Sequence, residues 1–244
     1  MRNLNVPKLK LRSCSLNSIC VGTRGEGKST LALYLANQSH TAIVVFDPRG
    51  MFDGHIVYSA GELEEALDQE DYLDGQPIVY RFDHGDANQA FEEMARVLFP
   101  PQFTRGGFAL IVDEAGDLQS SQSINLELRR AIAQHPTQGE MRVHMIQTSH
   151  RISEFNGKTK TCLDYIYQFR TNNPRDHQAL VDFTDDPAIV EVVRELPPHH
   201  LVRYEFKRRE DGGPQWEVWN DPGAWFAPIE VIPVEVRPST GAIQ

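Results

Sequence analysis

Residues Gly22 to Ser29 have the types and spacing of a site that binds phosphate groups. They read Gly-Thr-Arg-Gly-Glu-Gly-Lys-Ser and match the pattern G-x-x-x-x-G-K-[ST] without a gap. The glycines allow backbone angles closed to other residues, so that successive N–H groups can point at phosphates. The lysine supplies charge for the β- and γ-phosphates of ATP, and the serine hydroxyl is a ligand for Mg²⁺. The predicted ATP-binding set is Gly22, Thr23, Arg24, Gly25, Glu26, Gly27, Lys28, Ser29 and Thr30.

Two carboxylates, Asp113 and Glu114, directly follow the apolar run Phe108–Val112. Such a position is unfavourable for charge unless a cation or a ligand lies there. We expect Asp113 to hold Mg²⁺ through water, as a metal-site residue together with Ser29. We expect Glu114 to polarise the attacking water as a general base, so that the chain hydrolyses ATP.

These motifs lie at the ends of predicted strands that alternate with predicted helices. The continuous apolar runs Ala42–Phe46 and Phe108–Val112 are typical of strands buried on both faces, and Val143–Ile146 is predicted to be a third central strand. The phosphate motif lies between the short strand Ser18–Val21 and a helix over 29–38. The other predicted strands are 78–82, 165–169, 201–206 and 216–219, and the other predicted helices are 61–70, 87–99, 124–134, 174–183 and 187–196. The alternation predicts an α/β fold with a mostly parallel sheet covered on both faces.

The length of 244 residues favours one core with short additions. We expect an N-terminal arm over 1–14 and an ATPase core over 15–198. Residues 199–220 are expected to form a β-hairpin on the core, because two strand-like runs flank Asp211–Gly213. Residues 221–244 hold four prolines and are expected to form an extended tail.

The composition is that of a soluble globular protein, with 40% hydrophobic and 24% charged residues. No apolar run reaches the length of a membrane span, and the N-terminus lacks the apolar stretch of a signal peptide. Three irregularly spaced cysteines form neither a zinc pattern nor a disulfide framework, so we expect a cytoplasmic protein. The net charge of −10 argues against coating DNA over the whole surface, but allows contact with DNA at a few points.

Over roughly residues 17–170 the chain resembles the HerA/FtsK superfamily of ring-forming, DNA-pumping ATPases. The phosphate motif and Asp113-Glu114-Ala115 carry part of the resemblance. Val45–Phe52 is similar to the strand-two motif D-P-x-G-E-Y, with Met51 in place of the glutamate. Val143–Arg151 is similar to the family strand I-H-L-V-L-A-T-Q-R-P, with His150 in place of the glutamine. The resemblance implies a RecA-like (additional-strand) P-loop NTPase core.

The resemblance also assigns roles. The family glutamine reads the γ-phosphate, so His150 is the candidate sensor, with Thr148 and Ser149 beside it. In these rings a neighbouring subunit supplies an arginine to the transition state. Arg142 is the candidate for this arginine, and Arg129 and Arg130 on the preceding helix are the alternatives. The resemblance implies a homo-oligomeric ring, expected to be a hexamer, that translocates double-stranded DNA. Residues 158–160 or the turn 105–107 are candidate DNA-contacting loops.

The near-minimal size is similar to that of the genome-packaging ATPases of tailless, membrane-containing viruses and phages. This resemblance adds a portal or vertex protein as an expected partner, and a packaging vertex of the virion as an expected location. One alternative is a phage-morphogenesis ATPase related to zonula occludens toxin, although those proteins usually carry a transmembrane helix. A second is a nucleotide-dependent switch, against which Glu114 argues. The chain lacks the L-S-G-G-Q of ABC ATPases and the Arg-rich lid of small-molecule kinases.

Overall fold

The fold is described by a computed structural model for residues 16–38, 42–68, 76–82, 85–99, 108–120, 122–134, 143–206 and 216–219. The predicted arm 1–14 and tail 221–244 lie outside the described residues. The same is true of Arg142 and of the turn 105–107. Predictions about these segments therefore stay predictions.

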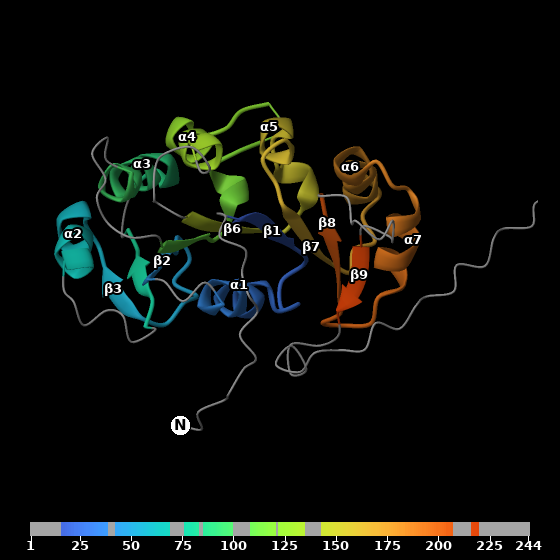
Figure 1. Cartoon of the computed structure of the whole chain (residues 1–244), viewed down its shortest axis with the longest axis horizontal. Helices are drawn as coiled ribbons and strands as arrows, with labels where there is room; N and C mark the ends of the chain where they lie inside the picture. Colours follow the sequence, from blue (N-terminus) through green and yellow to red (C-terminus); the bar gives the residue numbers. More distant parts are fainter. Residues whose placement is uncertain are drawn as a thin grey trace, which may run out of the picture.

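A single sheet contains the nine described strands, in the order β3-β4-β2-β5-β6-β1-β7-β8-β9 (Figure 1). Their bounds are β1 Leu16–Val21, β2 Ala42–Phe46, β3 His55–Val57, β4 Ile78–Tyr80, β5 Phe108–Val112, β6 Val143–Ser149, β7 Tyr165–Phe169, β8 Leu201–Glu205 and β9 Trp216–Trp219. The strands from β3 to β7 in this order are parallel, whereas β8 runs antiparallel to β7 and β9 antiparallel to β8. The predicted α/β class with a mostly parallel sheet is confirmed.

Strand β6 lies between β1, which leads into the phosphate motif, and β5, which leads into the two carboxylates. This is the additional strand of the expected RecA-like core. In its register Ser149 pairs with Val21 of β1, and Gln147 pairs with Val112 of β5. Because parallel strands end at the same edge of a sheet, the three motif-bearing segments after β1, β5 and β6 meet there.

The two faces of the sheet have unequal helical cover. Helix α1 lies on one face, and Figure 1 shows α3, α4, α5 and α6 on the other side of the sheet, with α2 and α7 toward its two ends. The bounds are α1 Lys28–Asn37, α2 Ala60–Asp68, α3 Ala87–Leu98, α4 Leu126–Gln134, α5 Gly157–Lys160, α6 Pro174–Thr184 and α7 Ala188–Glu195, with 3₁₀ turns η2 Ala115–Asp117 and η3 Ile152–Glu154. None of the described helices is long and apolar enough to cross a membrane.

Strand β5 shows why a strand in the middle of the sheet can be apolar throughout. Phe108, Leu110 and Val112 are buried in the larger core, on the side of α2, α3 and α4. Ala109 and Ile111 are buried in the smaller core, on the side of α1. Because both faces of the strand are covered, a polar side chain at any of its positions would be buried away from water, which is costly.

Apart from shifts of one or two residues at element ends, three elements differ from the sequence-based prediction. Strand β3 was not predicted, because two of its three residues are exposed and give no buried pattern. Strand β6 continues past Ile146 to Ser149, although its last three residues are polar. Residues 158–160 were predicted as part of a loop, but they form α5, where the side chain of Asn156 caps the helix by accepting from the N–H of Lys158.

A chain of buried side-chain hydrogen bonds joins β1, β6 and α5. Gln147 of β6 donates to Asn17 of β1 at 3.3 Å and accepts from Gln119, which follows η2, at 3.0 Å. The side-chain oxygen Oε1 of Gln119 in turn accepts from the hydroxyl of Thr159 and from the backbone N–H of Asn156. Each of these five side chains is less than a tenth exposed. The connection therefore lies inside the fold and is not a surface feature.

Candidate nucleotide site

The loop between β1 and α1 can adopt its shape only with glycine at three positions. Gly25 and Gly27 have φ angles of 87° and 102°, in the left-handed region. A Cβ atom on Gly22 would lie 2.6 Å from the Cβ atom of Phe169 on β7. Gly27 is also the N-cap residue of α1 and has no side chain to accept from the first N–H groups of that helix. The loop and the helix start therefore form a backbone cradle that fits phosphates.

Lys28 is the first residue of α1 and is held over the loop. Its ammonium group donates to the carbonyl oxygen of Thr23 at 3.1 Å and lies 3.5 Å from Nδ1 of His150. Burial lowers the pKa of Lys28, and the nearby Glu114 and Asp113 oppose this shift. The cation is thus partly dehydrated and faces two carboxylates, a setting in which bound phosphates would interact with it strongly.

Asp113 is buried at the end of β5 and is held by Thr148 of β6. The Thr148 hydroxyl donates to Oδ1 of Asp113 at 2.6 Å and accepts from the N–H of Glu114 at 3.3 Å. Burial raises the pKa of the Asp113 carboxyl, and the bond from Thr148 opposes this shift. A neighbouring cation would compensate the buried charge.

The residues present fit a magnesium ion. The Ser29 hydroxyl and the Asp113 carboxylate are hard oxygen donors, which Mg²⁺ prefers, and this ion usually keeps several water ligands. Among the described residues, no group of three His, Cys, Asp or Glu side chains could hold a metal ion without other ligands. An ion at Ser29 and Asp113 would therefore depend on phosphate and water oxygens as well.

Glu114 lies at the centre of a polar cluster. Its backbone is in the left-handed region, with φ 50° and ψ 47°, which turns the chain sharply away from β5. Its Oε1 atom lies 2.9 Å from Nε2 of His150 and 3.8 Å from Nε of Arg49. Because an ammonium group can only donate, Nδ1 of His150 accepts from Lys28, and Nε2 carries the proton that is donated to Glu114. His150 thus connects Lys28 to Glu114.

A cavity of about 290 Å³ opens beside this cluster, lined by Arg49, Glu114, Asp117, His150 and Glu154 among others. It has room for several water molecules. The carboxylate of Glu114 therefore borders both the cradle and a space from which water can approach.

The strand-two motif is built around Asp47. This buried carboxylate accepts from the backbone N–H groups of Met51 and Phe52, at 2.9 and 3.0 Å. It also forms an ion pair with Arg81 at 3.1 Å. Met51 is 61% exposed, so the residue in place of the family glutamate points away from the core. Asp47 has no role in the sequence-based prediction, although a carboxylate at the end of a buried strand is a usable signal.

Several solved structures resemble this fold at low sequence identity. The genome-packaging NTPase B204 of Sulfolobus turreted icosahedral virus 2, in complex with ATP-gammaS, aligns with a TM-score of 0.64 and 15% identity over 86% of this chain and 99% of that chain. VirB4 of Thermoanaerobacter pseudethanolicus aligns with a TM-score of 0.52 and 12% identity over 78% of this chain and 86% of that chain. The chain has the P-loop NTPase fold. No protein-family profile matches the chain, and no curated protein matches it by sequence.

The resemblance to P-loop ATPases of the HerA/FtsK type is therefore confirmed at the level of the fold. At these identities the similarity says nothing about individual side chains, so the roles of the site residues rest on the geometry above. Within that geometry the P-loop, Asp113, Glu114 and His150 come together, as expected from their places at the ends of β1, β5 and β6.

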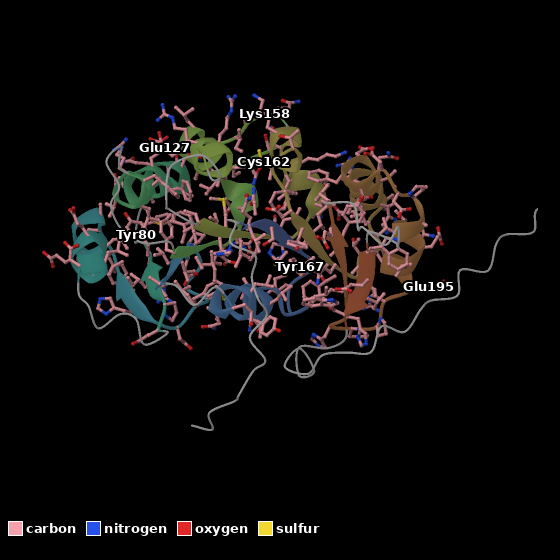
Figure 2. All side chains as sticks on the ribbon, in the orientation of Figure 1. Tyr80, Glu127, Lys158, Cys162, Tyr167 and Glu195 are labelled. Carbon is pink, nitrogen blue, oxygen red and sulfur yellow. The ribbon has the colours of Figure 1, made fainter. Side chains whose placement is uncertain are left out.

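Other predicted residues lie apart from this P-loop cluster. Arg129 and Arg130 are exposed on α4, and Arg130 forms an ion pair with Glu127. Lys160 is bound to α6, where it donates to the carbonyl oxygen of Asp182. Lys158 is exposed, and Figure 2 shows it on the same outer side of the molecule as Glu127. Of the two lysines, Lys158 is the better placed to meet a partner.

Glu26 connects the P-loop to the antiparallel edge of the sheet. Its carboxylate accepts from the backbone N–H of His199 at 2.9 Å, immediately before β8. His199 has a φ angle of 63°, in the left-handed region. Glu26 therefore supports the shape of the loop from outside, and Thr23 and Arg24 remain exposed.

Asp113 and Asp47 are both buried acids at strand ends, and we expect their replacement by asparagine to have opposite effects on stability. Asp113→Asn removes a charge whose burial raises its pKa, so at neutral pH the melting temperature of the nucleotide-free protein should rise, by about 1–4 °C. Asp47→Asn removes the partner of Arg81 and should lower the melting temperature by about 2–8 °C. Thermal unfolding with a metal chelator measures both.

The sign of the Asp113 effect fixes its pH dependence. A carboxyl group with a raised folded-state pKa destabilises the fold where it is ionised, and this penalty disappears as the pH falls toward the usual range of Asp, near 4. The gain from Asp113→Asn should therefore be present at pH 7 and absent near pH 4. A variant less stable than wild type at pH 7 would show that Asp113 is already compensated by its neighbours.

Proposed function

We propose that the chain is an ATP-hydrolysing DNA translocase that acts as a homo-oligomeric ring, most simply a hexamer, and packages a viral or phage genome. The observation that carries the proposal is the meeting of three segments at one sheet edge. These are the P-loop after β1, Asp113 and Glu114 after β5, and His150 after β6. The likeness of the fold to a viral genome-packaging NTPase supports the choice among P-loop functions.

In the proposed reaction, the N–H groups of the P-loop and the ammonium group of Lys28 bind the β- and γ-phosphates. Ser29 and, through water, Asp113 would hold Mg²⁺, which would supply positive charge to offset the charge developing on the phosphates. Glu114 accepts the proton of the attacking water. When ATP binds, His150 turns its donor from Glu114 toward the γ-phosphate, which makes it the sensor of the nucleotide state.

A ring is proposed because stabilisation of the transition state would use an arginine from a neighbouring subunit. The cluster around Glu114 contains the cations Lys28 and Arg49 from its own chain, and a further arginine from a neighbour would stabilise charge on the γ-phosphate. Arg142 is the proposed donor, with the exposed Arg129 and Arg130 on α4 as alternatives. DNA would be contacted at a few basic positions such as Lys158, which the net charge of −10 allows. A portal or vertex protein and a packaging vertex in the virion complete the proposal.

The experiment that tests the proposal measures ATP hydrolysis against protein concentration, with and without double-stranded DNA. A site shared by two subunits makes specific activity rise with concentration, and a translocase is stimulated by its DNA track. Light scattering under the same conditions reports assembly. A protein that stays monomeric with ATP and DNA, and whose specific activity is flat, is no ring translocase.

Mixing two inactive variants tests the shared site directly. Arg142→Ala chains keep Glu114, and Glu114→Gln chains keep Arg142. When Arg142→Ala chains are mixed with an excess of Glu114→Gln chains, some intact Glu114 sites receive Arg142 from a neighbour, so part of the activity should return. In the control, the Arg142→Ala chains are replaced by chains that carry both Lys28→Ala and Arg142→Ala. This mixture should stay inactive, because the chains that keep Glu114 then lack Lys28. No recovery in an assembled mixture would rule out Arg142 as the donated arginine.

A further inference from the structure

Within the described part of the chain, Arg49 and His150 are the two side chains paired with Glu114, and Arg49 is the one whose charge is permanent. We propose that Arg49 is a positioning residue: with His150 it fixes one oxygen of the Glu114 carboxylate and leaves the other to accept the proton of the attacking water. The inference rests on the proposed hydrolysis of ATP and adds to it a residue from the strand-two motif.

The backbone around Arg49 is held in place by the buried Asp47. Asp47 accepts hydrogen bonds from the backbone N–H groups of Met51 and Phe52. The chain therefore closes into a tight loop over residues 47–52. Gly50, with a φ angle of 69°, makes the turn within it. The ion pair between Asp47 and Arg81 keeps the buried carboxylate itself fixed. Arg49 is therefore presented to the site by a rigid turn, although its side chain is half exposed.

Arg49 and His150 both contact the same oxygen of the Glu114 carboxylate, Oε1. Nε of Arg49 is 3.8 Å from Oε1, and Nε2 of His150 is 2.9 Å from Oε1. Two partners on one oxygen restrict rotation of the carboxylate about its last side-chain bond. If His150 turns toward the γ-phosphate when ATP binds, Arg49 is the partner that remains. Orientation of a general base to within tens of degrees decides how well it accepts a proton.

Arg49 is itself oriented by a second carboxylate. Its Nη2 atom lies 3.7 Å from Oδ2 of Asp117, at the end of η2. The guanidinium group thus lies between Glu114 and Asp117, at the mouth of the cavity beside the site. Asp117 is half exposed and Glu114 nearly buried, so water weakens the first contact more than the second. The arrangement favours a guanidinium directed at Glu114.

The test separates catalysis from binding. Arg49→Ala should lower kcat for ATP hydrolysis by about 10- to 100-fold, while KM and the affinity for ATP change by less than about twofold. Arg49→Lys should recover part of the loss, because it restores the charge without the planar fork. The matched control is Arg96→Ala, which removes an exposed arginine paired with Glu92 at 3.6 Å on α3. The control should leave kcat unchanged, and both variants should melt within about 2 °C of wild type.

A double variant excludes an indirect effect. If Arg49 acts through Glu114, Arg49→Ala should cause no further loss of hydrolysis in a Glu114→Gln background. Weaker binding of ATP but not of ADP in Arg49→Ala would overturn the proposal, because it would make Arg49 a ligand of the γ-phosphate. A kcat within twofold of an active wild type would also overturn it. If the wild type hydrolyses no ATP, it is the proposed function that fails.

Discussion

Replacing Glu114 with glutamine is expected to leave ATP binding intact and to lower hydrolysis by about two to four orders of magnitude. The amide has the shape of the carboxylate, and its oxygen can still accept from Nε2 of His150, as Oε1 does at 2.9 Å in the native chain. It cannot accept the proton of the attacking water. Titration with a fluorescent ATP analogue measures binding, and phosphate release in a single turnover measures the chemical step.

Glu92→Gln on α3 is a suitable control for this variant, since it removes a carboxylate that is paired with Arg96 away from the P-loop. It should hydrolyse ATP at the wild-type rate. Normal turnover in Glu114→Gln would assign the proton transfer to another group, and loss of both binding and turnover would make Glu114 part of the binding site.

Lys28→Ala is the second large effect, and we expect it to reduce kcat/KM for ATP by at least about 1,000-fold. Lys28 is only 8% exposed, and burial lowers the pKa of its ammonium group, so a water-exposed cation elsewhere on the chain cannot take its place. Removing the ammonium group relieves the cost of burying it, which offsets the lost attraction to Asp113 and Glu114, so the nucleotide-free protein should keep its fold.

Phosphate release and nucleotide titration measure this effect, with Arg194→Ala on α7 as the control for loss of a distant cation. The control should bind and hydrolyse ATP normally. Hydrolysis by Lys28→Ala at more than about a tenth of the wild-type rate would mean that the phosphate site is wrongly assigned.

The central strands could be predicted from the sequence because burial on both faces leaves a readable pattern. Ala42–Phe46 and Phe108–Val112 have the bounds in the structure that the apolar runs predicted. The P-loop and the carboxylates after β5 could be predicted for a related reason. Their chemistry needs certain residue types at short spacing, so the signal is local.

The end of β6 could not be predicted in this way. Gln147, Thr148 and Ser149 are polar and yet fully buried, because their partners come from distant segments. Thr148 donates to Asp113, and Gln147 bonds to Asn17 and Gln119. A pattern of hydrophobicity reads such residues as the start of a loop, since nothing local shows what satisfies them.

The contact between Arg49 and Glu114 escapes sequence reasoning for a different reason. Each residue was placed in a motif, but the motifs lie on different strands, β2 and β5, and only the sheet order makes these strands neighbours. Sheet order is a property of the whole chain. A residue whose role lies in such a contact is therefore visible only once the strands are assembled.

The buried hydrogen bonds from Asn17 through Gln147 and Gln119 to Thr159 connect β1, β6 and α5 inside the fold. Breaking any bond in this chain would leave a polar group without water or partner, at a cost of about 1–3 kcal/mol. We therefore expect α5 to follow small displacements of β6, because the alternative is to break one of these hydrogen bonds. The strand that leads into His150 and the helix that carries Lys158 are therefore coupled through these buried hydrogen bonds.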